Sequence, residues 1–314
     1  MIGGMTGAAS GVDLHAAFVR ARKRAEHHMI GCERDGSSWR EETISELVWQ
    51  AARPYVTYAD FTRHQEAAVG ADWLWWWIDH DGECFGMLVQ AKRLFCRGPD
   101  WSLDFQAKRG DQMRALLSTA DRFSVPAAYV VYMGSVDYRA SYTSHISDPT
   151  ALEHARKATV SVLAALLAQY SFTPRDGAAT VLNSSIPLED LADTSAALGP
   201  IRDLNLRDTT SELRAFLLER QSGARRIAQM IFKTVSEARS GMFSLDVAER
   251  GRVDTAAVFD DLPLDSAHFG VPYFQHVLRG LRSELPSYVQ DMLAGRPPPT
   301  SVTNYVGGIV AIRC

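Results

Sequence analysis

Three residues of this chain, Asp72, Gln90 and Lys92, have types and a spacing that suit metal-assisted hydrolysis. An aspartate carboxylate and a glutamine amide offer hard oxygen ligands, which Mg²⁺ and Mn²⁺ prefer in proteins. A divalent cation lowers the pKa of a bound water and balances the negative charge that develops on a phosphate. The lysine ammonium can orient that water and stabilise phosphate oxygens. These groups therefore suit the hydrolysis of a phosphodiester.

Two strands of a predicted β-hairpin carry these residues. The segment 72–78 is rich in tryptophan, the turn residues 79–82 include Asp-Gly, and a second strand follows over 84–94. Because side chains alternate between the two faces of a strand, Gln90 and Lys92 project to the same side. The hairpin brings that side next to the first strand, although the sequence leaves the register open.

Other elements surround the hairpin in the sequence. They are helices over 13–28, from a cap at Ser37 or Ser38 to just before Pro54 and over 112–123, and a strand over 127–133. This order predicts an α/β fold in which helices flank a mixed β-sheet. The helix before the hairpin carries Glu42 and Glu46 on one face, where the two charges repel. A nearby cation would remove that repulsion, and so would solvent.

The block from Gly70-Ala71-Asp72 to Gln90-Ala91-Lys92 resembles the motif of the PD-(D/E)XK nucleases, the restriction-endonuclease-like superfamily. It also resembles an uncharacterised bacterial branch of that superfamily. The resemblance covers residues 39–133 and implies a restriction-endonuclease-like core. It also implies a role in the restriction of foreign DNA and in phage defence.

The same resemblance implies roles for individual residues. Asp72 and Gln90, together with a glutamate from the preceding helix, would bind Mg²⁺ or Mn²⁺, and Lys92 would position the attacking water. Glu46 matches the helix glutamate, and Glu42 is the alternative. Gln90 stands where most members of the superfamily carry an acid. A negative charge is therefore missing unless one of the glutamates supplies it.

A basic stretch follows the motif and is a candidate contact for nucleic acid. Arg93, Lys108 and Arg109 belong to a local surplus of positive charge, and the last two precede a helix whose amino terminus can meet a phosphate. Gln112 begins that helix, at a position where related nucleases often direct a glutamine toward the substrate. The stretch reads equally well as a solvated loop.

Composition narrows the class of protein. The chain has 314 residues, 46% hydrophobic residues and a net charge of −4, which is typical of a globular protein without a global basic surface. Its four cysteines form no CxxC pair, which argues against a zinc site and a disulfide framework. Neither a signal peptide nor a membrane-spanning run is evident, so we expect a cytoplasmic protein.

The second half of the chain carries no motif with an assigned chemistry. Its apolar periodicity predicts helices near 150–170, 187–194, 210–221, 223–239 and 273–294, and a final strand over 305–312. We therefore divide the chain into a tail with a basic helix (1–36), a nuclease-like core (37–135) and a mainly helical C-terminal region (136–314).

The resulting expectation is a metal-dependent endonuclease that acts on DNA. A homodimer suits the cutting of both strands of a duplex, and a partner protein of the same defence system is a further expected contact. Two alternatives stay open. In one, the site is degenerate and the protein is a module that binds nucleic acid or a partner protein. In the other, a nucleotide signal gates a nuclease effector.

Overall fold

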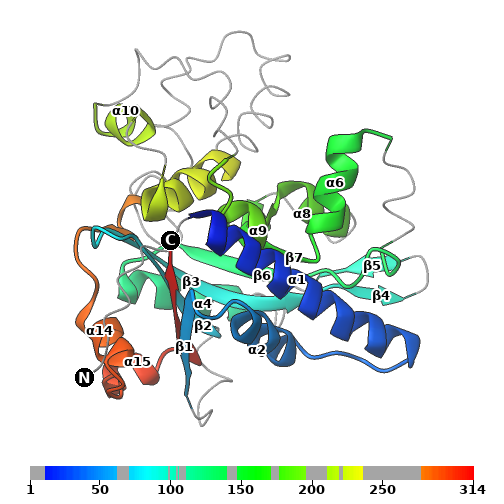
Figure 1. Cartoon of the computed structure of the whole chain (residues 1–314), viewed down its shortest axis with the longest axis horizontal. Coiled ribbons are helices and arrows are strands. Elements are labelled where there is room, and N and C mark those ends of the chain that lie inside the picture. The colour runs from blue at the N-terminus through cyan, green and yellow to red at the C-terminus, as the bar shows by residue number, and fades with distance from the viewer. Residues whose placement is uncertain are drawn as a thin grey trace.

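The computed structural model describes residues 11–61, 71–97, 100–103, 105, 111–139, 147–170, 177–195, 211–218, 222–235 and 277–314. Within these ranges, eight strands form one mixed sheet in the order β1-β10-β2-β3-β6-β7-β8, and β9 pairs with β3. Helices cover both faces of the sheet (Figure 1). The predicted α/β class with a mixed, helix-flanked sheet is therefore confirmed.

The strands of the main sheet are β1 (Val56–Asp60), β2 (Trp73–Ile78), β3 (Cys84–Arg93), β6 (Ala127–Tyr132), β7 (Val160–Ala164), β8 (Ile186–Pro187), β9 (Leu281–Arg282) and β10 (Gly308–Arg313). A separate two-stranded sheet is formed by β4 (Phe95–Arg97) and β5 (Asp100–Ser102).

The helices are α1 (Gly11–Arg34), α2 (Glu41–Ala51), α4 (Asp111–Phe123), α6 (Pro149–Lys157), α7 (Ala165–Tyr170), α8 (Gly177–Ser184), α9 (Leu188–Leu191), α10 (Ser211–Leu218), α14 (Ser287–Leu293) and α15 (Thr300–Thr303). A further helix spans 223–235. Among the described residues, none of these helices combines the length and the apolar content that crossing a bilayer requires.

The predicted hairpin, the flanking helices and the third strand are confirmed as β2, β3, α1, α2, α4 and β6. The cap predicted at Ser37 or Ser38 is wrong, because α2 begins at Glu41 after Arg40 at the N-cap. The helix predicted over 150–170 is wrong in its middle, where β7 pairs with β6 and β8. Its β-branched run, Val160-Ser161-Val162, fits a pleated surface better than a helix. The helix predicted over 273–294 is also wrong as a continuous element, since β9 interrupts it before Pro286.

The final predicted strand is confirmed as β10, and it lies inside the sheet. β10 runs parallel to β2 and antiparallel to β1, with Ile312 opposite Trp77 on one side and Val56 on the other. A strand from the end of the chain thus lies between two strands of the early part. Strand β1 is not predicted from the sequence; it is short and only partly buried.

The tryptophan-rich strand β2 forms the centre of the core. Trp75 packs edge-on against Trp49 of α2, with ring centroids 5.0 Å apart, and Trp77 packs against Phe18 of α1 at 5.8 Å. Trp76 points to the opposite face, where it meets Tyr288 of α14 at 6.3 Å. The alternation expected for a strand therefore buries tryptophans on both faces, and these rings belong to the core.

Candidate metal centre

The site forms where β3 extends beyond the strand beside it. β2 pairs with β3 only as far as Val89, whereas β3 continues to Arg93. Past that point two carboxylates bind the β3 backbone. Asp72 Oδ2 accepts a hydrogen bond from the Ala91 amide at 2.7 Å, and Glu41 Oε1 accepts one from the Arg93 amide at 2.9 Å. Amides two residues apart on a strand are separated by about 6.6 Å, so both carboxylates lie along one short edge.

Glu41 shares the electrostatic environment of Asp72 and Lys92. Burial raises the pKa of the Glu41 carboxyl to about 7, the positive charge of Lys92 opposes the shift, and the negative charge of Asp72 adds to it. The hydrogen bond from Arg93 lowers this pKa, and Glu42 raises it. Two acids and a lysine that influence one another in this way are typical of functional sites.

Gln90 and Lys92 project from β3 on the face that α4 covers. Both side chains are buried, with 2% of Gln90 and 8% of Lys92 exposed. The Lys92 ammonium donates a hydrogen bond to Gln112 Oε1 of α4 at 2.6 Å. Within the described part of the chain, Gln90 Oε1 is buried and has no hydrogen-bond partner. An oxygen in that state costs about 1–3 kcal/mol unless a ligand engages it.

The remaining metal-ligand candidates of the sequence analysis lie on the exposed side of α2. Glu42 and Glu46 are both solvent-exposed. Together with Glu41 and Asp60 they line an open hollow of about 640 Å³, to which Arg93 also contributes. The structure therefore brings Asp72, Gln90 and Lys92 together, and the helix glutamate that binds the β3 edge beside them is Glu41.

Glu41 is not among the ligands predicted from the sequence. The sequence offers no signal that separates Glu41 from the other two glutamates, because the start of α2 at Glu41, after Arg40 at the N-cap, is known only from the structure. The resemblance implied Glu46, with Glu42 as the alternative, and both residues line the same hollow as Glu41 on the exposed side of α2.

The candidate nucleic-acid contacts have mixed outcomes. Gln112 contacts Lys92, as described above. The Arg93 guanidinium lies over the rings of Phe95, at 4.2 Å, and Trp39, at 5.8 Å, and it donates a hydrogen bond to the Trp39 carbonyl. Lys108 and Arg109 lie outside the described residues. Arg93 is therefore held by its neighbours at the rim of the hollow.

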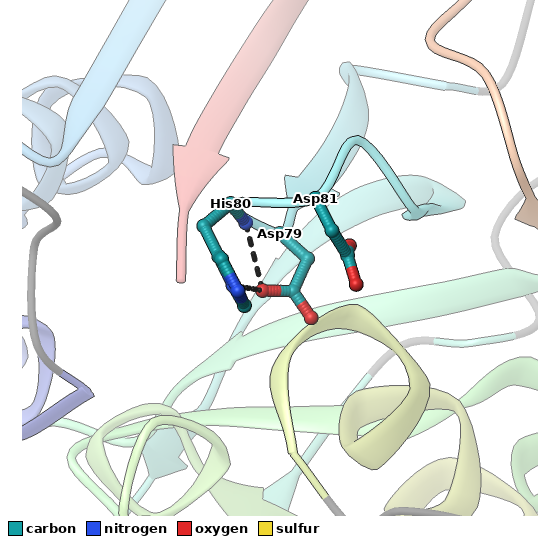
Figure 2. Close-up of side chains that lie close together, drawn as sticks. All are labelled: Asp79, His80 and Asp81. Atoms are coloured by element: carbon teal, nitrogen blue, oxygen red, sulfur yellow. Dashed lines mark hydrogen bonds and ion pairs between the residues drawn. The ribbon is translucent and has the colours of Figure 1, made fainter.

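A second acidic group lies in the turn between β2 and β3 (Figure 2). Asp79, His80 and Asp81 form the one set of three His, Cys, Asp or Glu side chains, among the described residues, whose ligand atoms lie within 4.8 Å of one another. Asp79 Oδ1 accepts a hydrogen bond from the His80 amide at 2.7 Å and lies 2.7 Å from His80 Nδ1.

The contacts of this turn explain its carboxylates without a metal. The Glu83 amide donates to Asp81 Oδ1 at 3.2 Å, which closes the turn. A Cβ on Gly223 would lie 1.9 Å from Asp79 Oδ2, so the start of helix 223–235 packs directly on that carboxylate. Negative charge at a helix amino terminus is favourable. We therefore interpret Asp79 as a residue that joins the turn to this helix.

Comparison with known proteins identifies the family of this chain but assigns it no activity. Residues 14–313 match the model of a family of unknown function, DUF6615, so the chain belongs to that family. A search of curated proteins found no match, and neither did a search of solved structures.

Proposed function

We propose that this member of a family of unknown function is a metal-dependent nuclease with a restriction-endonuclease-like core. Its site consists of Asp72, Glu41, Gln90 and Lys92. The observation that carries the proposal is the pair of carboxylates on the β3 edge, where Asp72 accepts from Ala91 and Glu41 accepts from Arg93. Three elements contribute charged groups to this edge: β3 carries Lys92, the residue before β2 is Asp72, and α2 begins with Glu41.

The residues present fit a hard divalent cation. Asp72 and Glu41 offer carboxylate oxygens, and Gln90 offers a buried amide oxygen that has no hydrogen-bond donor among the described residues. Oxygen donors of this kind favour Mg²⁺ or Mn²⁺. Asp72, Glu41 and Gln90 would hold such an ion, which would supply Lewis-acid chemistry: it would lower the pKa of a bound water and balance negative charge on the phosphate. Glu41 supplies the negative charge that Gln90 lacks.

Lys92 is placed where its ammonium can stabilise negative charge on a phosphate and orient a water molecule. The residue is 8% exposed, and its ammonium is held by Gln112 through a 2.6 Å hydrogen bond. A cation fixed in a poorly hydrated site stabilises negative charge on phosphate oxygens more strongly than a solvated one. We assign it to the orientation of the attacking water and to the phosphate.

We take DNA as the substrate and restriction or phage defence as the setting. Both come from the resemblance of the Asp72–Lys92 block to the PD-(D/E)XK nucleases. The alternative is a catalytically degenerate module that binds nucleic acid or a partner protein. The observation that favours this alternative is the amide of Gln90, which replaces a charged ligand.

Cleavage of DNA by the full chain separates the two functions. Supercoiled plasmid and linear duplex are incubated with the wild-type protein and with Asp72→Ala and Lys92→Ala, in Mg²⁺ and in Mn²⁺. The proposal expects metal-dependent cleavage that either substitution reduces by about 100-fold or more. Cleavage that survives both substitutions contradicts the site. A wild-type protein that binds DNA but cuts it in neither metal favours the degenerate module.

A further inference from the structure

A buried pair of hydroxyl groups joins α2 to the sheet behind Glu41. Ser45 of α2 and Tyr132 of β6 are both fully buried, and Ser45 Oγ lies 2.7 Å from Tyr132 Oη. Ser45 Oγ also donates to the backbone carbonyl of Glu41, one turn earlier in the helix, at 3.0 Å. The pair therefore connects β6 with the first residue of α2.

The direction of these hydrogen bonds follows from their chemistry. A serine hydroxyl has one hydrogen, and the Glu41 carbonyl can only accept. Ser45 gives its hydrogen to that carbonyl, so Tyr132 must be the donor to Ser45 Oγ. Burial raises the pKa of the Tyr132 phenol above its usual range, the hydrogen bond with Ser45 opposes the shift, and the charges of Glu41 and Asp72 add to it. The phenol therefore stays a neutral donor.

The other end of the connection reaches the carboxylate of the same glutamate. Tyr132 lies opposite Arg93 in the register of β6 and β3. The Arg93 amide donates to Glu41 Oε1 at 2.9 Å. The Glu41 carbonyl is thus linked to Tyr132 through Ser45. The Glu41 carboxylate is bound by β3, the strand that pairs with β6 at Tyr132.

Stability alone is a poor reason for this pair. Ile44, Val48 and Trp49 already bury α2 against the core. A serine that bonds back to the carbonyl four residues earlier slightly destabilises a helix, and buried hydroxyls cost free energy unless both are satisfied. The helix also begins without a side-chain cap, because Arg40 at the N-cap makes no such bond. The Ser45–Tyr132 hydrogen bond is therefore better explained as a contact that fixes the position of the start of α2.

We propose that the Ser45–Tyr132 hydrogen bond positions Glu41 for metal binding, by fixing the start of α2 against β6. The inference rests on the proposed function, since it concerns the same metal site. Ser45 and Tyr132 are positioning residues: they act through Glu41 and do not contact the substrate. Residues that orient a metal ligand typically change metal affinity by about 10- to 100-fold when they are replaced.

The test measures Mn²⁺ affinity by calorimetry on the full chain, so that it does not depend on catalysis. Tyr132→Phe and Ser45→Ala are each expected to weaken Mn²⁺ binding by about tenfold or more. Both substitutions break the same hydrogen-bonded connection. The double variant is therefore expected to have the same Mn²⁺ affinity as the single variant that binds Mn²⁺ less tightly. Ser45→Thr retains the hydroxyl and is expected to restore affinity to within about twofold of wild type.

A matched control separates positioning from general loosening of α2. Val48→Ala removes buried packing from the same helix and leaves the hydroxyl pair intact, so it should lower thermal stability and leave Mn²⁺ affinity unchanged. Equal weakening of Mn²⁺ binding by Val48→Ala contradicts the inference. So does an unchanged affinity in Tyr132→Phe, or in Ser45→Ala if the tyrosine variant does not fold.

Asp72→Ala and Glu41→Gln distinguish failure of the inference from failure of the function. If both abolish Mn²⁺ binding while Tyr132→Phe and Ser45→Ala do not weaken it, only the positioning inference is wrong. If the wild-type chain binds no Mn²⁺, or if Asp72→Ala binds as tightly as wild type, the metal site itself is wrong and the inference falls with it.

Discussion

The ammonium of Lys92 on β3 donates a 2.6 Å hydrogen bond to the side-chain oxygen of Gln112 at the start of α4. Both residues are polar, and the lysine is itself buried on a strand in which Arg93 alone is partly exposed. A hydrogen bond to a charged group contributes about 1.5–3 kcal/mol, enough to hold the ammonium in one orientation. The lysine is thereby oriented by a helix that follows the motif in sequence.

We expect Gln112→Ala to lower the single-turnover rate of DNA cleavage by about tenfold, because Lys92 loses the acceptor that orients it. Arg114→Ala is the matched control. It lies on the same helix, is exposed, and pairs with Asp111 at the surface. A Gln112→Ala enzyme as fast as wild type, or an equal loss in Arg114→Ala, would show that this contact does not serve catalysis.

The raised pKa of Glu41 predicts how stability depends on pH. Between about pH 4.5 and 7 the unfolded chain loses the proton of this carboxyl while the folded chain keeps it. Stability contributed by this group is therefore fully present below pH 4.5 and is lost as the pH rises through 7. The loss amounts to at most about 3.5 kcal/mol, at about 1.4 kcal/mol for each pKa unit.

Glu41→Gln carries no titrating group at this position, so its stability curve should fall less than that of wild type over the same interval. Urea denaturation of both proteins at a series of pH values, without divalent metal, measures the difference. Parallel curves between pH 4.5 and 7.5 would mean that the carboxyl is not buried as described.

Metal affinity should have the opposite pH dependence. A carboxylate binds a cation only when it is ionised, so a carboxyl with a pKa of about 7 must release a proton on binding. As the pH is raised toward 7, the apparent Mn²⁺ affinity is expected to increase about tenfold per pH unit. Above pH 7 it is expected to level off. Calorimetry in buffers of different ionisation enthalpy also counts the released proton. An affinity that is flat from pH 5.5 to 8 would contradict the participation of Glu41.

The turn shown in Figure 2 provides a test of the competing metal site. Because Asp79 joins the turn to helix 223–235, we expect Asp79→Ala to destabilise the protein by about 1–3 kcal/mol and to leave Mn²⁺ affinity unchanged. His80→Ala is the control, since 58% of that side chain is exposed and its loss should have little effect on stability. Loss of Mn²⁺ binding in Asp79→Ala would move the metal centre to this turn.

The sequence predicts the local parts of the site better than their assembly. Tryptophan alternation, the Asp-Gly turn and the Gln90–Lys92 spacing depend on neighbours along the chain, and each predicts an element that the structure contains. The place of β10 between β1 and β2 depends on pairing between distant segments, which a periodic pattern does not encode.

The helix glutamate illustrates the same limit. Glu41, Glu42 and Glu46 are equivalent as residue types, and which one reaches β3 depends on how α2 crosses the sheet. That crossing is set by Trp49 against Trp75 and by Ser45 against Tyr132, two contacts between segments that are far apart in the sequence. The choice between the three glutamates therefore requires the packed structure.

The most direct test of the proposed site is the Mn²⁺-dependent rate of plasmid cleavage by Glu41→Gln and Glu46→Gln. Both variants replace one carboxylate of the same helix with an amide of equal size. The account predicts that Glu41→Gln loses about 100-fold or more of the wild-type rate, while Glu46→Gln stays within about twofold. A wild-type chain that cuts no DNA, a Glu41→Gln chain that cuts at the wild-type rate, or a loss confined to Glu46→Gln would contradict it.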